Sequence, residues 1–283
     1  MNEKNQSLIL GIVTILCWGS LATFGNLLIH LPPFYVLGIT FLIGSLPAFF
    51  KFKKMFPKWK VMLWGVTGYF GYHFFLFYSF RYAPAIEANL INYLWPVIMV
   101  LITPLVFPTE KLKFYHFAGA ALAVTGSILL VMGKGIDPES ENLKGYLLAL
   151  GAAFTWPIYS IGKKKMAAVP VWAVGSFCFI SGILCLITHS LIEPRVILQT
   201  TDAWLLLLMG IGPFGLAFYS WDVAMKTGDP RVIGALAYLT PVLSTLSLVV
   251  FANQNMASTT LFAMILIILG SSSGLLDFFP SKR

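Results

Sequence analysis

One short apolar stretch of the sequence carries a carboxylate, an amide and two aromatic rings. It runs from Pro84 to Pro96 and contains Glu87, Asn92, Tyr93 and Trp95. A carboxylate inside a membrane span costs roughly 2.5 kcal/mol or more, so Glu87 is expected to face water or a partner. It suits a counter-charge for an amine or a proton-coupling group. The alternative is an interfacial carboxylate that pairs with Arg81 or accepts hydrogen bonds from amides at a helix N-terminus.

Aromatic side chains form the second group of candidates. Several lie well inside apolar stretches, where each polar ring edge needs an internal partner. A cavity lined in this way would bind flat apolar groups, and it would hold a cation over the ring faces. Ordinary packing is the competing interpretation for each ring. The rings concerned are Trp18, Tyr78, Tyr93, Trp95, Trp156 and Tyr238.

Four prolines interrupt the same apolar stretches. Each removes a backbone donor and frees the carbonyl four residues earlier. Because an unpaired carbonyl is costly in lipid, such positions are tolerated where they face protein or a wet cavity. Ordinary helix kinking is the alternative. We predict helix breaks at Pro96, Pro157, Pro213 and Pro241.

No set of residues predicts a metal, a cofactor or a catalytic group. The four histidines, at positions 30, 73, 116 and 189, have no neighbours at metal-ligand spacing. The sequence contains no P-loop, zinc signature or nucleophile elbow. We therefore expect no cofactor, no metal and no enzymatic activity. A membrane enzyme acting on lipid is the disfavoured alternative, because scattered groups can still meet in three dimensions.

The elements that must position these residues are membrane helices. Of the 283 residues, 58% are hydrophobic and only 11% are charged, and the mean hydropathy is +0.83. Soluble domains have about 45–50% apolar and 25% charged residues. Apolar stretches long enough to cross a bilayer recur along the chain. We predict an all-α integral membrane protein with ten transmembrane helices, near 8–30, 33–50, 61–82, 85–106, 114–133, 144–162, 171–192, 203–224, 231–252 and 257–279.

The basic residues indicate the orientation of these helices. With the N-terminus inside, 15 of the 19 lysines and arginines fall in interior segments. Only Arg81, Lys134, Lys144 and Arg195 fall outside. Since basic residues accumulate in cytoplasmic loops, both termini are expected in the cytoplasm. The formal charge of +8 is spread over several loops and forms no stripe among stacking aromatics, which argues against nucleic-acid binding.

The two halves of the chain resemble each other when one is shifted by about 140 residues. Trp18 then lies over Trp156, and the run Tyr93 to Pro96 lies over Tyr238 to Pro241. With five helices per half, the second half must enter the membrane from the opposite side. We predict one membrane domain made of two inverted five-helix repeats, 1–137 and 138–283. Such repeats are typical of transporters that bind substrate near the midplane.

The run Ala85-Ile86-Glu87, followed by Asn92-Tyr93-Leu94-Trp95-Pro96, resembles the aromatic amino-acid exporters of the EamA branch of the drug/metabolite transporter superfamily. The resemblance covers essentially the whole chain. It implies a bacterial inner-membrane exporter that works by alternating access, with substrate in a central cavity. It further implies cavity-wall roles for Tyr93, Trp95 and Trp156, a polar contact from Asn92, and looser matches at Tyr78 and Tyr82.

The expected activity is therefore export of aromatic and bulky apolar amino acids, with these small molecules and the lipid bilayer as partners. The sequence identifies no oligomeric partner. An exporter of other metabolites or of lipophilic cations, for which Glu87 would be the cation partner, is the alternative within the superfamily.

Overall fold

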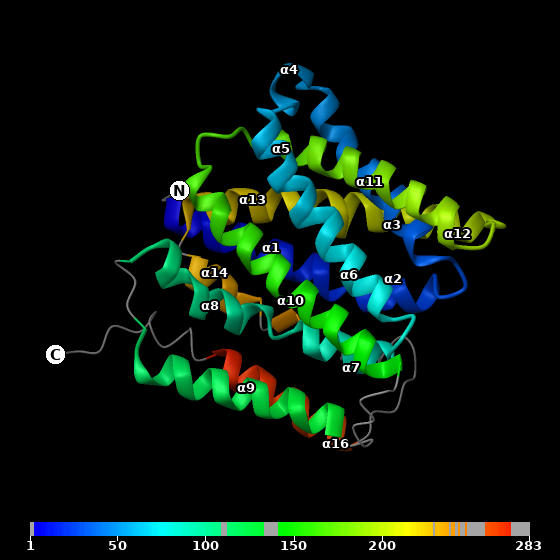
Figure 1. The fold of residues 1–283 in the computed structure, drawn as a ribbon. Helices are drawn as coiled ribbons and strands as arrows, with labels where there is room; N and C mark the ends of the chain where they lie inside the picture. The colour runs from blue at the N-terminus through cyan, green and yellow to red at the C-terminus, as the bar shows by residue number, and fades with distance from the viewer. Residues whose placement is uncertain are drawn as a thin grey trace.

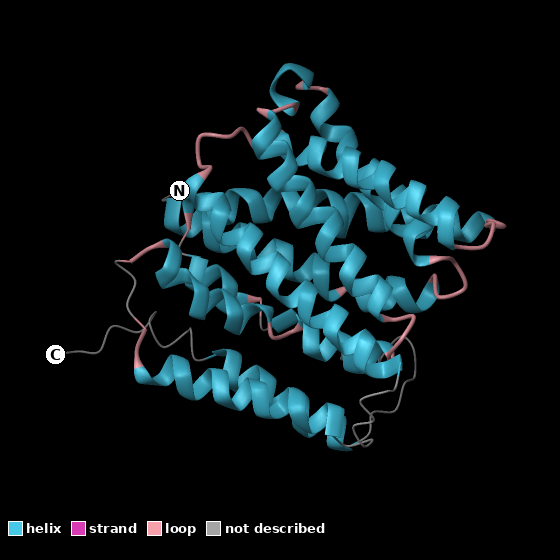
Figure 2. Ribbon diagram, viewed as in Figure 1, coloured by secondary structure: helices cyan, strands magenta, loops and turns pink. Residues whose placement is uncertain are grey.

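The computed structural model describes residues 3–108, 112–132, 141–228, 230–237, 239–240, 243, 247 and 258–272. Helix is the only regular secondary structure over these ranges (Figure 2). The all-α prediction is confirmed for this part of the chain. The stretches expected to be helical do contain helix, although half of 231–252 lies outside the described residues.

The helices follow one another through short connections. In chain order they are α1 (Glu3–Gly19), α2 (Leu21–Leu27), α3 (Pro33–Phe49), α4 (Phe52–Met55), α5 (Trp59–Val66), η1 (Thr67–Gly71), α6 (Tyr72–Ser79), α7 (Ala85–Asn92), α8 (Trp95–Val106), α9 (Phe114–Met132), α10 (Glu141–Lys165), α11 (Ala173–Ile192), α12 (Thr200–Ile211), η2 (Gly212–Leu216), α13 (Ala217–Thr227), α14 (Pro230–Leu236) and α16 (Ser258–Ser271).

Several of these helical segments are long and apolar enough to cross a membrane. They are Asn5–Leu27, Glu87–Val106, Ala173–Ile192 and Thr200–Thr227. Shorter apolar helices occur at Pro33–Phe49 and Leu261–Gly270. Many of their large apolar side chains are exposed, for example Leu105 at 82% and Leu191 at 77%. A surface of this kind is stable against lipid rather than water.

Two of the long helical segments contain a single π-helical turn. The turn η1 joins α5 to α6, and η2 joins α12 to α13. Pro213 lies in the first turn of η2, where its missing N–H removes one helical hydrogen bond. A π-turn inserts one residue into an α-helix and is frequent at functional sites. Each turn is followed by buried side chains, His73 after η1 and Phe218 after η2.

Helices from the two halves of the sequence pack against each other. Contacts join α3 to α11, α1 to α13, α6 to α10, α8 to α14 and α9 to α16. In Figure 1, α9 and α16 lie side by side at one edge, while α1, α10 and α13 lie nearer the middle. Buried aromatic side chains come from both halves of the chain, for example Trp18 and Phe41 from the first and Trp156 and Trp221 from the second. The core therefore lies between the halves rather than within either one.

The close approach of α3 and η2 depends on a glycine. Gly44 of α3 faces η2, and a Cβ added there would lie 2.5 Å from the carbonyl oxygen of Phe214. No side chain fits at that distance. Gly44 thus allows α3 to approach the π-turn closely.

Candidate functional site

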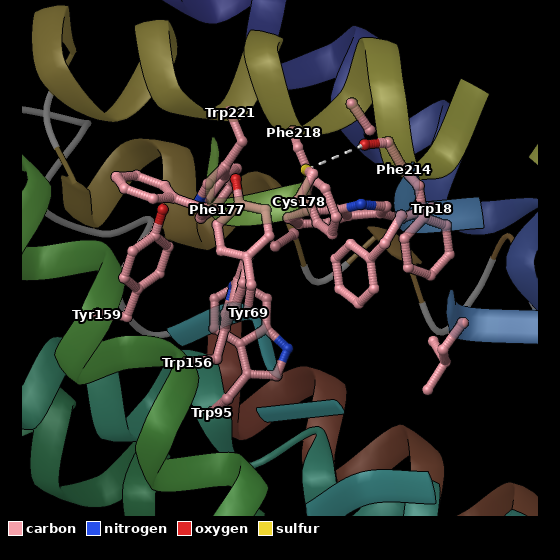
Figure 3. Close-up of a cluster of buried hydrophobic side chains, with 14 of the residues drawn as sticks. Trp18, Tyr69, Trp95, Trp156, Tyr159, Phe177, Cys178, Phe214, Phe218 and Trp221 are labelled. Atoms are coloured by element: carbon pink, nitrogen blue, oxygen red, sulfur yellow. Dashed lines mark hydrogen bonds between the residues drawn. The ribbon is translucent and has the colours of Figure 1, made fainter. Parts of the chain in front are cut away.

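Four tryptophans from four helices meet in the core. They are Trp18 of α1, Trp95 of α8, Trp156 of α10 and Trp221 of α13, and each is at most 8% exposed. The ring centroids of Trp18 and Trp221 are 5.0 Å apart, those of Trp18 and Trp156 are 5.5 Å apart, and those of Trp95 and Trp221 are 6.0 Å apart. The rings stand around a common centre in Figure 3.

Further rings complete this group, which we name the aromatic cluster. The Tyr69 ring of η1 packs edge to face on Phe218 at 4.5 Å and on Tyr159 at 5.4 Å. Tyr159 follows Trp156 by three residues on α10, and Phe218 precedes Trp221 by three residues on α13. Side chains three residues apart share a helix face, so each helix presents two rings to the centre. The cluster comprises Trp18, Tyr69, Trp95, Trp156, Tyr159, Phe218 and Trp221.

A polar contact lies beside Trp156. The amide Nδ2 of Asn92 donates a hydrogen bond to the hydroxyl of Tyr72 at 3.0 Å. The Tyr72 ring in turn lies 5.2 Å from that of Trp156. The Asn92 Oδ1 atom is buried and has no hydrogen-bond partner among the described residues. Asn92 therefore offers a free acceptor close to the aromatic cluster.

His73 is part of the packed core next to the aromatic cluster. Its Nδ1–H donates to the Tyr69 carbonyl at 2.7 Å, one turn earlier in the helix. Its ring lies 5.0 Å from Phe41 and 5.5 Å from Phe214. These contacts support a packing role for His73.

Tyr78, Tyr82 and Glu87 lie in a second group apart from the aromatic cluster. The Tyr82 hydroxyl donates to the Tyr78 hydroxyl at 3.3 Å, and the Lys144 ammonium lies 4.0 Å from the centre of the Tyr82 ring. Glu87 is 7% exposed and accepts a hydrogen bond from the Tyr146 hydroxyl. We name these five residues the outer group, because they lie at the end of the helices expected to face outside.

The remaining candidates occupy different positions. Tyr93 is half-buried between α7 and α8 and packs both against the main core, which contains the four tryptophans, and against a smaller buried group around Leu90 and Met264. Tyr238 and Pro241 lie outside the described residues. The helix breaks just before Pro96, which occupies the first turn of α8. At Pro157, by contrast, α10 continues without a break from Glu141 to Lys165.

Sequence reasoning missed several members of the cluster and a buried charge. Trp221, Tyr69, Phe218 and Tyr159 have no adjacent proline and no repeat partner that would single them out. The charge pattern places Lys163 among the 15 basic residues of the interior segments, just after the predicted span 144–162, yet its side chain is only 3% exposed and pairs with Asp222. The available signal was Asp222 itself, a carboxylate within the predicted span 203–224.

A pocket of about 640 Å³ lies elsewhere, at the surface between α3, α12, η2 and α13. Its walls include Pro47, Leu216 and Trp172, together with Phe50, which is 90% exposed. No charged residue lines it. A charged or zwitterionic ligand would lose its hydration there without gaining a charged partner, which argues against an amino-acid site in this pocket.

Known sequences decide the family. The pattern of the EamA-like transporter family matches residues 5–132 and, a second time, residues 143–273. This chain belongs to the EamA-like transporter family. It is consequently a multi-pass membrane protein of a transporter family rather than a member of an enzyme family.

Individual relatives of this EamA-like transporter carry names that concern amino-acid export. The aromatic amino acid exporter YddG of Ancylobacter novellus is 35% identical over 95% of this chain and 97% of its own length. A probable amino-acid metabolite efflux pump of Salmonella typhimurium is 27% identical over 95% of this chain and 94% of its own length. A crystal structure with 35% identity superposes with a TM-score of 0.82 over 96% of this chain and 97% of the other.

Proposed function

We propose that this EamA-like transporter exports aromatic and bulky apolar amino acids across the bacterial inner membrane. The observation that carries the proposal is the aromatic cluster, in which four tryptophans from both halves of the chain converge. The name of the Ancylobacter relative, which is similar over nearly the full length, supports the same substrate class.

The chemistry of the cluster suits an aromatic substrate. Each aromatic pair contributes about 0.5–1.5 kcal/mol beyond the burial of its area, and edge-to-face and offset contacts are both favourable. A substrate ring that enters between Trp18, Trp156 and Trp221 exchanges their mutual contacts for contacts with itself. The exchange is nearly balanced, which permits release as well as binding.

We also propose that the ten helices form two inverted five-helix repeats, 1–137 and 138–283. The same family pattern matches both halves. The helix pairing supports this symmetry: α1 pairs with α13 in the way that α10 pairs with α6, while α3 pairs with α11 and α9 with α16. The π-turns η1 and η2 lie in corresponding segments of the two halves.

Alternating access follows from this arrangement. The aromatic cluster lies between the repeats, so a rocking motion of one repeat against the other separates its rings on one side of the membrane at a time. In the described conformation the rings are in contact and buried. We propose that Asn92, Trp18, Trp95 and Trp156 contact the substrate, and that the outer group lies along its exit path.

Lipophilic cations are the second candidate substrates, because aromatic ring faces attract positive charge. The faces of Tyr159, Tyr69 and Phe177 are already occupied by the Lys163 ammonium, whose nitrogen lies 4.9 Å from the centre of the Tyr159 ring. This buried ammonium repels a second cation. The geometry therefore favours amino acids over cations.

Counterflow in proteoliposomes tests the proposal. Vesicles loaded with unlabelled phenylalanine should take up labelled phenylalanine, and external tryptophan should block this uptake. Threonine, lysine and a lipophilic cation should compete at least tenfold less well, which corresponds to about 1.4 kcal/mol. Equal competition by the lipophilic cation would favour the second candidate. Chemical alteration of the recovered phenylalanine would instead indicate an enzyme.

A further inference from the structure

Three charged side chains meet in the interior near the expected cytoplasmic ends of α10 and α13. Lys163 forms an ion pair with Oδ1 of Asp222, and Lys226 donates to Oδ2 of the same carboxylate at 2.7 Å. The three side chains are between 3% and 10% exposed. Lys226 also donates to the Val169 carbonyl at 2.7 Å. We name Lys163, Asp222 and Lys226 the charged triad.

The charged triad adjoins the aromatic cluster on the same two helices. Lys163 follows Trp156 by seven residues, which places it roughly 10 Å farther along α10 on the same face. Asp222 directly follows Trp221, whose indole N–H donates to the Ser160 hydroxyl at 3.2 Å. A molecule with an aromatic ring at one end and charged groups at the other would match both sites together.

The charged triad has more positive than negative groups, and not all of its hydrogen-bond donors have partners within the described part of the chain. Two ammonium groups share a single carboxylate, so the triad carries one net positive charge. An ammonium has three N–H donors. Lys163 directs one at Asp222, and the faces of Tyr159, Tyr69 and Phe177 surround it. Its remaining N–H groups can donate hydrogen bonds to an additional anionic partner.

Two phenol hydroxyls next to Lys163 are also unused. The hydroxyls of Tyr69 and Tyr159 are buried close to each other, and neither makes a hydrogen bond of ordinary geometry to another described residue. The two side chains are 0% and 2% exposed. In Figure 3 both hydroxyls point away from Trp95 and toward the helix that carries Trp221. Buried donors left unpaired are costly, and a ligand acceptor would satisfy them.

We infer that Lys163, with the hydroxyls of Tyr69 and Tyr159, binds the α-carboxylate of the transported amino acid, and that Asp222 binds its α-ammonium group. The bound zwitterion takes the place of the ion pair between Lys163 and Asp222. Lys226 stays hydrogen-bonded to the Asp222 carboxylate. This inference rests on the proposed function and narrows its substrates to zwitterionic amino acids. A simple closing ion pair would explain neither the second lysine nor the two unpaired hydroxyls.

Competition in the counterflow assay tests this inference. The probes are phenylalanine, phenylalaninamide, which lacks the carboxylate, and 3-phenylpropionate, which lacks the ammonium group. In the wild type both analogues should compete with labelled phenylalanine at least tenfold less well than phenylalanine itself. Lys163→Met should weaken competition by phenylalanine at least tenfold, as expected for the loss of a hydrogen bond to a charged group. Competition by phenylalaninamide should stay unchanged.

Matched variants separate recognition from folding. Lys165→Met removes the same charge from an exposed position two residues away, so competition by all three probes should stay as in the wild type. The double variant Tyr69→Phe with Tyr159→Phe keeps both rings and removes only the hydroxyls. In this variant, phenylalanine should lose more of its ability to compete than phenylalaninamide does. Thermal unfolding in detergent checks each variant, and the double variant decides the matter if Lys163→Met fails to fold.

The outcomes distinguish the inference from the function on which it rests. Folded wild type that shows no amino-acid counterflow overturns both. The inference alone is overturned if the wild type carries phenylalanine but the Lys163→Met and Tyr69→Phe/Tyr159→Phe variants prefer phenylalanine over phenylalaninamide as strongly as the wild type does. Loss of this preference in the variants supports it.

Discussion

The tryptophan side chains of the aromatic cluster combine burial with mutual contact. Trp156 has ring contacts with more members of the cluster than any other member has, among them Trp18 at 5.5 Å, Tyr159 at 5.4 Å and Trp221 at 6.3 Å between ring centroids. Because Trp156 of α10 contacts Trp18 of α1 and Trp221 of α13, a shift of any one of these helices changes the packing against the other two.

Replacing Trp156 should therefore separate packing from transport. Trp156→Ala removes a buried ring at a cost of about 3–5 kcal/mol, and it should lower both the unfolding temperature and phenylalanine counterflow. Trp156→Phe keeps a ring and should fold, with counterflow reduced severalfold. Trp204→Ala is the control, because Trp204 is 64% exposed. Counterflow at the wild-type level in folded Trp156→Phe and Trp156→Ala proteins would remove Trp156 from the substrate site.

Glu87 permits a test of the outer group. Glu87→Gln keeps an acceptor for the Tyr146 hydroxyl but loses the charge. We expect a loss of about 1–2 kcal/mol in stability, because a hydrogen bond to a charged group becomes a neutral one. Since Glu87 lies outside the aromatic cluster, the apparent affinity for phenylalanine should change by less than about twofold. A tenfold loss of affinity would place Glu87 at the substrate instead.

Only those cluster residues that have a local sequence signal could be predicted from the sequence. Trp18, Trp95 and Trp156 were identified because each lies in a repeat-matched stretch or beside a proline, and the structure brings these three together. Trp221, Tyr69 and Lys163 have no such signal. Their positions depend on how α13, η1 and α10 are rotated about their axes, which tertiary packing decides.

At the scale of the elements, the π-turns and the glycines that face them set the approach of the helices. A Cβ on Gly44 would lie 2.5 Å from the carbonyl oxygen and 2.8 Å from the carbonyl carbon of Phe214 in η2. These are backbone atoms, which cannot rotate away. The crossing of α3 with η2 therefore has little freedom to adjust.

Gly44→Ala should consequently destabilise the protein. Overpacking of this kind costs about 1–3 kcal/mol, which should appear as a lower unfolding temperature in detergent. Gly25→Ala is the matched control, because nothing lies within 4 Å of a Cβ at Gly25 and alanine favours helix by up to about 1 kcal/mol. If both variants melt at the wild-type temperature, the close crossing of α3 and η2 is not a constraint.

Hydropathy and turn residues were sufficient to predict helices over the described stretches, because length and composition alone determine what can cross a bilayer. The π-turns were not predictable. Pro213 marks η2, but η1 contains no proline, and the helix passes through Pro157 unbroken. A proline removes one hydrogen bond, whereas the neighbouring helices decide whether the chain bends there.

At the scale of the whole molecule, the distribution of lysine and arginine predicts the orientation. Both termini and the Lys51 to Lys60 segment should face the cytoplasm, and Arg195 should face outside. Residues 53 and 195 are both exposed, so each can carry a labelling site.

Cysteine labelling in intact cells checks this orientation. In a background with Cys17, Cys178 and Cys185 replaced by alanine, a membrane-impermeant maleimide should label Arg195→Cys from outside. Lys53→Cys should react only after the membrane is permeabilised. The reverse pattern would contradict the predicted orientation.

Photo-crosslinking with benzoylphenylalanine tests most directly whether the aromatic cluster is the substrate site. Mass spectrometry of the irradiated protein should locate the label on residues of α1, α8, α10 or α13 next to Trp18, Trp95, Trp156 or Trp221, and excess tryptophan should prevent the labelling. Labelling confined to the 640 Å³ surface pocket near Pro47 and Trp172, unaffected by tryptophan, would contradict it.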